Sequence, residues 1–378
     1  MTHTVETPAI LHICLSTGWG GLEMYPIRIG KEFINQKYNV YGLCVSGTQV
    51  AKGMREAGIE TFEVSSKKKL LILQILQLNK WLKQRNVTVI HCHKSGDILV
   101  SALLSILTKR TTLFTEHMGV TRPKKDLYHK WVYSHVNSVF SISNETLQRN
   151  LKALPVAASK ISRLWLGTDI PNSPIDDIET IRLIKEELGL DPTATIIGNV
   201  GRLCLGKGQL ELLNAFAKLT PTYPQSHLLL VGGIDANEGA DGEFVTMLKH
   251  RVSELHLKER VHFVGFRRDT DRMLAIMDIV CIPSHNEAFG LTVIEAMAAK
   301  KAIIAANTGA LPEVLGNSAL FCNPLSSNDI TTAIRQYIEN PELSKSNASK
   351  AFQRAQSEFS MQTHIKRLEH YINQIQVK

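Results

Sequence analysis

The chain has 378 residues, more than a single hydrophobic core usually holds, so its length favours two domains. With 44% hydrophobic and 21% charged residues, its composition excludes an intrinsically disordered or fibrous protein. The net charge of +8 is uneven, because residues 1–171 hold 22 Lys and Arg against 11 Asp and Glu. This excess predicts an anionic partner for the first half of the chain.

The ends and the cysteines exclude further classes. The first ten residues lack the basic and apolar regions of a signal peptide, and the longest apolar stretch, residues 70–78, is too short to cross a bilayer. The six cysteines are scattered, without a CxxC pair. We therefore expect reduced core cysteines, neither disulfides nor zinc ligands, and a cytoplasmic protein.

Short apolar runs alternate with helical patterns along the whole chain. The runs cover residues 10–16, 39–46, 59–65, 87–93, 111–117, 138–143 and 161–167, then 193–201, 227–233, 260–266, 278–284, 301–307 and 318–324. This alternation predicts an α/β fold of two doubly wound Rossmann-like domains with parallel sheets, facing a central cleft. We expect domains at 1–172 and 173–357, and a C-terminal helix at 358–378 that packs back on the first domain.

The loop after the first predicted strand reads GWGGLE. Gly20 and Gly21 fit a turn into the helix predicted over 21–35, where free N–H groups suit an anion. A plain strand–helix turn is the alternative.

A basic amphipathic segment follows, SSKKKLLILQILQLNKWLKQRN (65–86). Its cations are Lys67, Lys68, Lys69, Lys80, Lys83 and Arg85, and a second basic group holds Arg122, Lys124, Lys125 and Lys130. Basic amphipathic helices bind anionic membrane surfaces. The alternative is a helix that covers the sheet and has a solvated basic end. No nucleic-acid recognition motif is visible, so nucleic acid is not expected as a partner.

Histidines mark the ends of two predicted strands. His91 and His93 alternate in HCHKSGD and so face the same side, but the sequence offers no obvious third metal ligand, which favours a structural role. His117, in FTEHMG, is a candidate to hydrogen-bond a sugar hydroxyl or to handle a proton. A structural histidine at a strand end is the alternative there too.

The first loop of the second half, GRLCLGKGQ, combines glycines with two cations. Arg202 and Lys207, with the N-terminus of the helix predicted over 209–219, suit a diphosphate. Because residue 208 is Gly, where a P-loop requires Ser or Thr, this loop is not a P-loop. An exposed basic turn is the alternative.

The stretch PSHNEAFGLTVIEAMAAKK (283–301) holds Glu287 and Glu295. An acid/base pair for cleaving sugars is one interpretation, but eight residues of continuous helix would separate the carboxyls by about 12 Å, which weakly disfavours a hydrolase. Two separate hydrogen-bond acceptors along one extended ligand fit better.

These motifs together resemble the donor-binding half of glycosyltransferase family 4, whose members are retaining, nucleotide-sugar-dependent enzymes with the GT-B fold. The resemblance rests on GRL…GKG, VHFVGF and PSHNEAFGLTVIEAMAAKKAIIAANTGALPEVL, and less closely on the glycine loop and FTEH. It implies that Arg202 and Lys207 neutralise the donor diphosphate, that Glu295 binds the ribose and that Glu287 contacts the transferred sugar. It further implies that the amides of Phe289, Gly290 and Leu291 bind sugar and phosphate, that His117 faces the sugar, and that Gly20 and Gly21 close over the phosphates.

Two departures from the family pattern concern the finer donor pocket. Leu166 replaces a frequent Asn, and Lys300 stands where glycine is usual. The fixed cations replace Mg²⁺ in stabilising the leaving diphosphate, so we expect no metal and no cofactor besides the nucleotide sugar.

The resulting hypothesis is a retaining glycosyltransferase of the hexosyltransferase type. It would use a UDP- or GDP-type sugar and a glycolipid or phosphorylated acceptor such as a lipopolysaccharide core, as a peripheral protein at the inner face of the cytoplasmic membrane. The alternatives are a nucleotide-sugar epimerase, a polysaccharide synthase on the same fold, and a sugar- or lipid-binding protein without catalysis. The sequence does not define the base, sugar, linkage, acceptor or oligomeric state.

Overall fold

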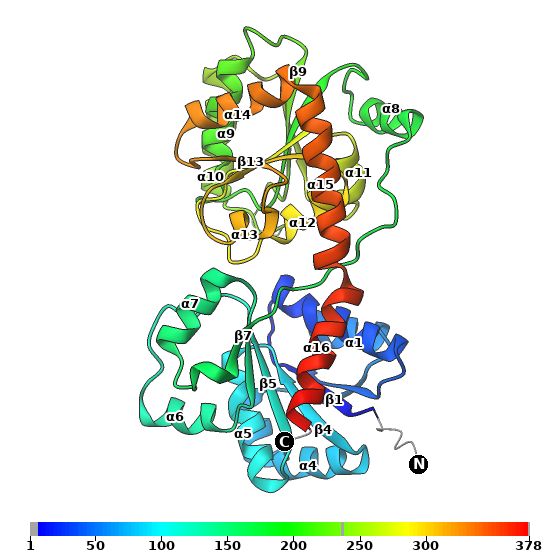
Figure 1. Ribbon diagram of the computed structural model, residues 1–378, viewed down its shortest axis with the longest axis vertical. Coiled ribbons are helices and arrows are strands. Elements are labelled where there is room, and N and C mark those ends of the chain that lie inside the picture. The colour runs from blue at the N-terminus through cyan, green and yellow to red at the C-terminus, as the bar shows by residue number, and fades with distance from the viewer. Residues whose placement is uncertain (1–6, 236–237, 377–378) are drawn as a thin grey trace. The chain divides into compact units, whose positions relative to one another are not determined.

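The computed structural model describes residues 7–235 and 238–376, which form two compact units. Unit 1 runs to Thr168 and resumes at Met361, and unit 2 runs from Asp169 to Ser360. Each unit is built on a sheet of parallel strands with helices packed against it (Figure 1). The prediction of two doubly wound α/β domains is confirmed.

Seven parallel strands form the sheet of unit 1 in the order β3-β2-β1-β4-β5-β6-β7. They are β1 (Ala9–Cys14), β2 (Val40–Val45), β3 (Glu60–Val64), β4 (Val87–Cys92), β5 (Thr111–Glu116), β6 (Ser138–Ser141) and β7 (Ile161–Arg163). The strand order reverses between β1 and β4, which are direct neighbours. In doubly wound sheets this switch point is where ligands bind.

The two faces of this sheet differ in chemistry. Leu11 and Ile13 of β1 face an apolar core, while the intervening His12 faces the opposite side, as the period of two in a strand requires. The helices of the unit are α1 (Gly21–Asn35), α2 (Gln49–Glu56), α3 (Lys67–Lys69), α4 (Ile75–Gln84), α5 (Ile98–Leu107), α6 (Leu127–Ser134), α7 (Asn144–Ala153) and α16 (Met361–Gln376), with short turns η1 (Leu70–Gln74), η2 (Ser95–Asp97) and η3 (Ala158–Lys160). Helices α4 and α5 contribute buried leucines to the apolar face.

The basic segment at 65–86 is not one regular helix. It begins as α3, continues as the π-helical turn η1 and then becomes α4. Leu70 and Leu78 are fully buried, whereas Ile72, Leu73 and Leu76 are 66–70% exposed. A segment that is apolar nearly all round can bury only one side against the sheet, so an apolar ridge stays at the surface.

The C-terminal helix α16 belongs to unit 1, as the sequence predicted. It begins at Met361, whose N–H donates to the carbonyl of Thr168 at 2.9 Å, and not at residue 358, because the preceding helix continues to Phe359. A Cβ at Gly167 would lie 2.5 Å from the Cβ of His364. Glycine at 167 therefore allows α16 to approach the end of the first sheet.

Unit 2 has six parallel strands in the order β10-β9-β8-β11-β12-β13. They are β8 (Thr195–Val200), β9 (Ser226–Val231), β10 (Val261–Gly265), β11 (Ile279–Ile282), β12 (Ala302–Ala306) and β13 (Leu320–Cys322). The helices are α8 (Ile178–Glu187), α9 (Gln209–Leu219), α10 (Gly242–Glu254), α11 (Thr270–Ala275), α12 (Leu291–Ala298), α13 (Leu311–Leu315), α14 (Ser327–Glu339) and α15 (Pro341–Phe359). The strand order reverses between β8 and β11.

Two further expectations concern cysteines and membranes. All six cysteines are free thiols, and five of them are buried, as predicted for reduced core residues. Within the described ranges, no helix combines the length and hydropathy that a bilayer crossing needs.

Candidate functional site

The loop between β8 and α9 is shaped by glycine. Gly208 is left-handed (φ 76°), and a Cβ there would lie 2.0 Å from the carbonyl oxygen of Pro283. Any larger residue would push this loop away from the end of β11. Gly208, the residue that distinguishes this loop from a P-loop, therefore allows the Lys207 loop to pack against the end of the neighbouring strand β11.

Lys207 and Glu287 form an ion pair across the switch point of unit 2. Their side chains are 28% and 17% exposed, so the pair is half-buried but open to a ligand. Both line a cavity of about 200 Å³ at the ends of β8 and β11. Its walls are Asn199, Val200, Gly201, Arg202, Lys207, Gln209, Ser284, Glu287 and Thr292.

Arg202 adds a second cation to this cavity. Its side chain is exposed, and it makes no salt bridge to another residue of the described ranges. One paired lysine, one exposed guanidinium and one carboxylate thus converge on a small polar space. Such a set can neutralise a diphosphate and accept a hydrogen bond from a hydroxyl.

The loop that carries Glu287 is held from two sides. The N–H of His285 donates to the carbonyl of Gly206 at 2.8 Å, and the N–H of Ala310 donates to the carbonyl of Glu287 at 2.9 Å. Gly309 is left-handed (φ 62°), and a Cβ there would lie 2.6 Å from that same carbonyl oxygen. The position of Glu287 is therefore fixed by the backbone of the loops on both sides.

Helix α12 starts directly after this loop. Its N-cap, Gly290, is left-handed (φ 86°) and provides no side-chain cap, so the N–H groups of Leu291 and Thr292 are available to an anion, whereas that of Val293 donates to the carbonyl of Gly290. Phe289 is buried and packs edge-on against Phe359, with ring centroids 6.0 Å apart. Only the backbone of Phe289 is therefore placed to meet a donor. Leu291 opens the helix and is half-buried.

Glu295 lies one turn further along α12 and does not line the cavity around Lys207. It is half-buried and takes part in an interaction within the protein. Glu287 thus lies in the loop before α12 and Glu295 lies within the helix, and only Glu287 lines the cavity.

Sequence reasoning missed two polar residues that support the cavity. The side-chain amide of Asn199 donates to the carbonyl of Cys281 at 2.7 Å, which ties β8 to β11. Gln209 is fully buried and donates to the carbonyl of Arg202 at 3.0 Å. An amide inside the otherwise apolar run TATIIGNVG was the available signal for Asn199.

The glycine loop of unit 1 is less constrained than its counterpart in unit 2. Gly20 is the N-cap of α1 with an extended backbone (φ −178°), and Gly21 is the first helical residue. A Cβ at Gly20 would meet only the carboxylate of Glu23, at 3.5 Å. Helix α1 begins at Gly21, as predicted. However, no contact with the end of the sheet requires glycine at residue 20.

A polar network next to this loop was also missed. The hydroxyl of Ser16 donates to Glu23 at 2.6 Å and accepts from Lys94 at 3.1 Å. Ser16 and Lys94 each follow a strand closely, β1 and β4 respectively. Their position after these strands was the signal, because parallel strands end at the same edge of the sheet.

His117 follows β5 and is buried, with its ring 5.0 Å from that of Tyr25 in an edge-on contact. Its Nε2 has no hydrogen-bond partner among the described residues. Burial lowers the pKa of His117 to about 3, with a smaller contribution from His364. His117 is therefore a neutral imidazole, which suits it to hydrogen bonding with a ligand rather than to holding a positive charge.

Comparison with known families matches both halves of the chain. The family described as glycosyl transferases group 1 matches residues 180–354, and the family described as glycosyltransferase family 4 matches residues 19–170. The first match contains every candidate residue of the cavity in unit 2, and the second contains the glycine loop and His117.

Individual relatives agree with this match. The lipopolysaccharide core biosynthesis mannosyltransferase LpcC of Rhizobium leguminosarum bv. viciae is 26% identical over 303 residues, 78% of this chain and 80% of that protein. The D-inositol 3-phosphate glycosyltransferase of Corynebacterium jeikeium is 33% identical over 185 residues, 47% of this chain and 43% of that protein. Among solved structures, Anabaena Alr3699/HepE in complex with UDP has a TM-score of 0.83 at 22% identity, covering 97% of this chain and 100% of that one, which shows a shared fold.

Proposed function

Because the chain belongs to the family 4, group 1 glycosyltransferases, we propose that it transfers a sugar, with retention, from a nucleoside diphosphate sugar to an envelope glycolipid. An acceptor of the lipopolysaccharide-core type is favoured. The observation that carries the proposal is the Lys207–Glu287 ion pair in the cavity where β8 and β11 diverge. This is the crevice in which a doubly wound domain binds a nucleotide.

The donor diphosphate is assigned to Arg202, Lys207 and the N-terminus of α12. A leaving nucleoside diphosphate gains negative charge in the transition state, and fixed cations and helix N–H groups stabilise that charge. These groups supply the role of a divalent metal ion, so the proposed reaction uses none. Without ligand, Glu287 neutralises Lys207, and the diphosphate competes for the same ammonium group when it binds.

Glu287 and Glu295 are assigned to two parts of the donor. Glu287 lines the cavity and is placed to accept from a hydroxyl of the transferred sugar. Glu295, which lies within α12, accepts hydrogen bonds from the ribose hydroxyls. Two acceptors at separate points of α12 and its preceding loop suit an extended donor better than a single scissile bond.

The proposed chemistry needs no nucleophile from the protein. The acceptor hydroxyl attacks the anomeric carbon on the face from which the diphosphate leaves, and the departing phosphate oxygen takes the proton of that hydroxyl. Neutral His117 is assigned a hydrogen bond to the transferred sugar, and the Gly20–Gly21 loop is assigned to the phosphates.

A thermal-shift screen with UDP-, GDP- and ADP-sugars tests the donor assignment. Specific ligands stabilise the folded state by mass action, so a UDP- or GDP-type sugar should raise the melting temperature. The increase should persist in Lys258→Ala, an exposed lysine outside the cavity, and disappear in Lys207→Ala. No increase with any nucleotide sugar would overturn the proposal, and acceptor-independent conversion of the donor would favour an epimerase.

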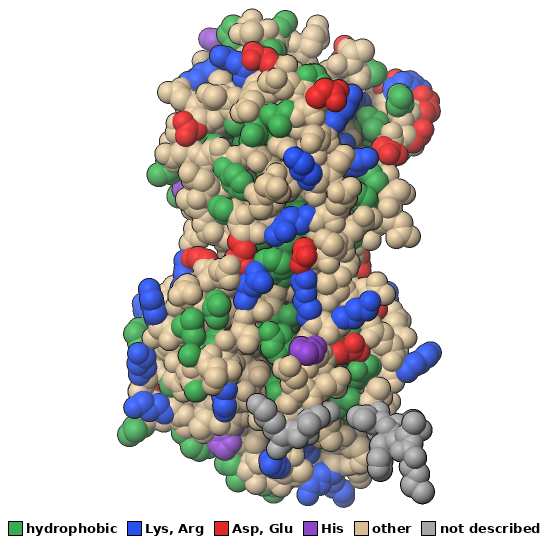
Figure 2. All heavy atoms as spheres, viewed as in Figure 1, with side chains coloured by type: hydrophobic (Ala, Val, Ile, Leu, Met, Phe, Trp, Pro, Cys, Tyr) green, Lys and Arg blue, Asp and Glu red, His purple; other side chains and the backbone are tan. Residues whose placement is uncertain are grey.

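The acceptor assignment rests on unit 1. Its surface is basic, and Lys and Arg side chains recur over the face of this unit that Figure 2 shows. The relative LpcC is named for lipopolysaccharide core biosynthesis. A basic unit 1 suits a phosphorylated, lipid-linked acceptor.

An anionic membrane surface is the proposed docking partner of unit 1. Helices α4, α5 and α6 pack in sequence, and each exposes large apolar side chains. These are Ile72, Leu73 and Leu76 beside α4, Ile106 of α5, and Leu127, Tyr128 and Trp131 of α6. Lys68, Lys69, Lys80 and Lys130 are exposed beside them. Apolar side chains within a basic surface are typical of proteins that bind anionic lipid peripherally.

Vesicle flotation tests this docking. The protein should float with anionic vesicles at low salt and not with zwitterionic ones. The double variant Leu73→Ser and Leu76→Ser should lose this binding, whereas Leu183→Ser, which alters an exposed leucine of unit 2, should keep it. Failure of the unaltered protein to bind anionic vesicles at low salt would rule the membrane partner out.

A further inference from the structure

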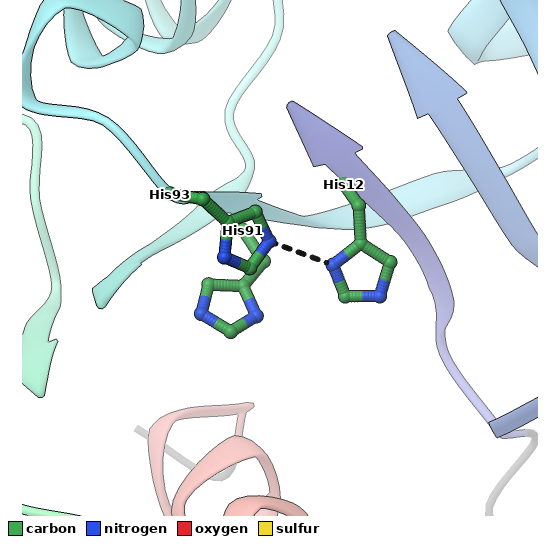
Figure 3. A group of neighbouring side chains, drawn as sticks. All are labelled: His12, His91 and His93. Atoms are coloured by element: carbon green, nitrogen blue, oxygen red, sulfur yellow. Dashed lines mark hydrogen bonds between the residues drawn. The ribbon is translucent and has the colours of Figure 1, made fainter. Parts of the chain in front are cut away.

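The histidine pair that ends β4 has a third partner that its sequence position does not reveal. His12, in the middle of β1, is the direct register partner of His91 on β4. Because neighbouring residues on parallel strands face the same side, His12, His91 and His93 meet above the switch point of unit 1 (Figure 3). A third possible ligand, which was not obvious from the sequence, therefore lies beside His91 and His93.

The spacing of the three imidazoles suits a metal ion. One ring nitrogen from each of the three lies within 4.8 Å of the others. His12 Nδ1 and His93 Nε2 are 3.1 Å apart. Two imidazole nitrogens bound tetrahedrally to zinc are about 3.3 Å apart, given Zn–N bonds of about 2.0–2.1 Å. An ion would thus need only small side-chain movements.

The protein alone does not satisfy these rings. All three side chains are at most 1% exposed, and His12 Nε2 and His93 Nδ1 have no hydrogen-bond partner among the described residues. These two nitrogens lie opposite the pair that is 3.1 Å apart, so no hydrogen bond to a described residue outside the cluster fixes the orientation of these two rings.

A residue behind the cluster fixes the orientation of one ring. His91 Nε2 is 2.8 Å from the hydroxyl of Thr115 on β5. If Nε2 carries the proton and donates to Thr115, Nδ1 of His91 is the nitrogen left for a metal. Metal-binding histidines are typically oriented in this way by a second hydrogen bond.

We propose that His12, His91 and His93 form a binding site for a divalent transition-metal ion, with Zn²⁺ as the expected occupant. Three neutral imidazoles favour borderline metals over Mg²⁺ or Ca²⁺, which prefer oxygen ligands. The ion would tie β1 to β4 beneath Tyr25, whose ring is 5.3 Å from His93 and 5.0 Å from His117. Its role is structural and separate from the donor cavity of unit 2.

Metal titration of the full chain tests this proposal. After treatment with a chelator, the protein should bind one equivalent of Zn²⁺, and Zn²⁺ but not Mg²⁺ should raise its melting temperature. Co²⁺ in place of Zn²⁺ should give the visible absorption of a tetrahedral site. These measurements do not depend on glycosyl transfer, so their failure leaves the proposed donor function untouched.

Matched variants separate this site from weak binding to surface histidines. His12→Gln should weaken Zn²⁺ binding at least tenfold. His262→Gln should not, because His262 pairs with His227 at 2.9 Å in a two-histidine contact of unit 2. If His12→Gln does not fold, Thr115→Val serves instead, since it keeps all three ligands and should still weaken binding. Equal Zn²⁺ binding by the unaltered protein, His12→Gln and Thr115→Val, or no binding by the unaltered protein, would overturn the proposal.

Discussion

The two units use the same architecture but place opposite chemistry at their switch points. In unit 2, Lys207 and Glu287 meet as a half-buried charged pair in an open cavity. In unit 1, His12, His91 and His93 meet as buried neutral rings. A shared fold therefore does not specify the site, since the residues within and after the strands decide whether this position carries charged or neutral side chains.

The largest expected effect tests the charged side of this comparison. Lys207→Ala removes a cation that we assign to the leaving diphosphate and breaks the ion pair with Glu287, so kcat/KM for sugar transfer should fall by about 10²–10³. Steady-state kinetics with the matched donor measures this loss. Lys258→Ala should retain activity, and full turnover by Lys207→Ala would contradict the diphosphate assignment.

The next largest effect is expected on the stability of unit 1, which should depend on pH through a buried neutral histidine. His364 of α16 is buried, lies 2.8 Å from the hydroxyl of Tyr25 and 2.7 Å from the carbonyl of Trp165, and burial lowers its pKa from 6.5 to about 4. The hydrogen bond to the carbonyl of Trp165 raises this pKa, and the nearby charge of Arg367 lowers it. Because the unfolded state binds the proton more tightly, stability should be complete above pH 6.5 and fall as the pH approaches 4.

Between pH 7 and pH 5, this single group should cost about 2 kcal/mol of unfolding free energy. His364→Gln should remove that part of the pH dependence, as measured by denaturant unfolding followed through Trp fluorescence. His370→Gln, at an exposed position on the same helix, is the control. An unchanged pH dependence in His364→Gln would show that the histidine is not buried in the neutral form.

A smaller pair of effects compares the two glycine loops. Gly208→Ala combines a left-handed backbone with a Cβ 2.0 Å from a carbonyl oxygen, so it should destabilise unit 2 by at least about 2 kcal/mol. Gly20→Ala should cost at most about 1 kcal/mol, because its backbone is extended and its surroundings are open. Thermal unfolding measures both. Equal losses of stability in the two variants would contradict the expected difference between the two glycine loops.

The smallest effect concerns a departure from the family pattern. Lys300 is left-handed (φ 56°) at the end of α12, which explains physically why glycine is usual there. Lys300→Gly should stabilise the protein by up to about 1 kcal/mol, since relief of strain is partly offset by backbone entropy. Thermal unfolding checks this, with Lys258→Gly as a control that should not stabilise.

Local patterns predicted the strands well and the contacts between them poorly. Each predicted apolar run overlaps one of the observed strands, because buried parallel strands are continuous apolar runs bounded by turn residues. The same logic predicted helices over 21–35 and 209–219. The donor residues were accessible to sequence reasoning because GRLCLGKG and the Glu287 loop each lie within one short segment.

The histidine cluster and the Ser16–Glu23–Lys94 network were not accessible in this way. His12 and His91 are 79 residues apart, and their contact depends on β1 lying beside β4, which chain order does not reveal. The π-helical turn after Lys69 was not predicted. The apolar residues of this segment indicate that it is buried, but they do not indicate which of its sides faces the sheet. Non-local pairing and local helix irregularities thus set the limit of the sequence interpretation.

The return of the chain to unit 1 at Met361 has a consequence for biosynthesis. Helix α16 carries His364, the partner of Tyr25, yet it leaves the ribosome only after the whole of unit 2. Unit 1 therefore cannot reach its final packing cotranslationally ahead of unit 2, although N-terminal domains generally fold first. During synthesis, Tyr25 therefore lacks its buried partner His364 until α16 has been made.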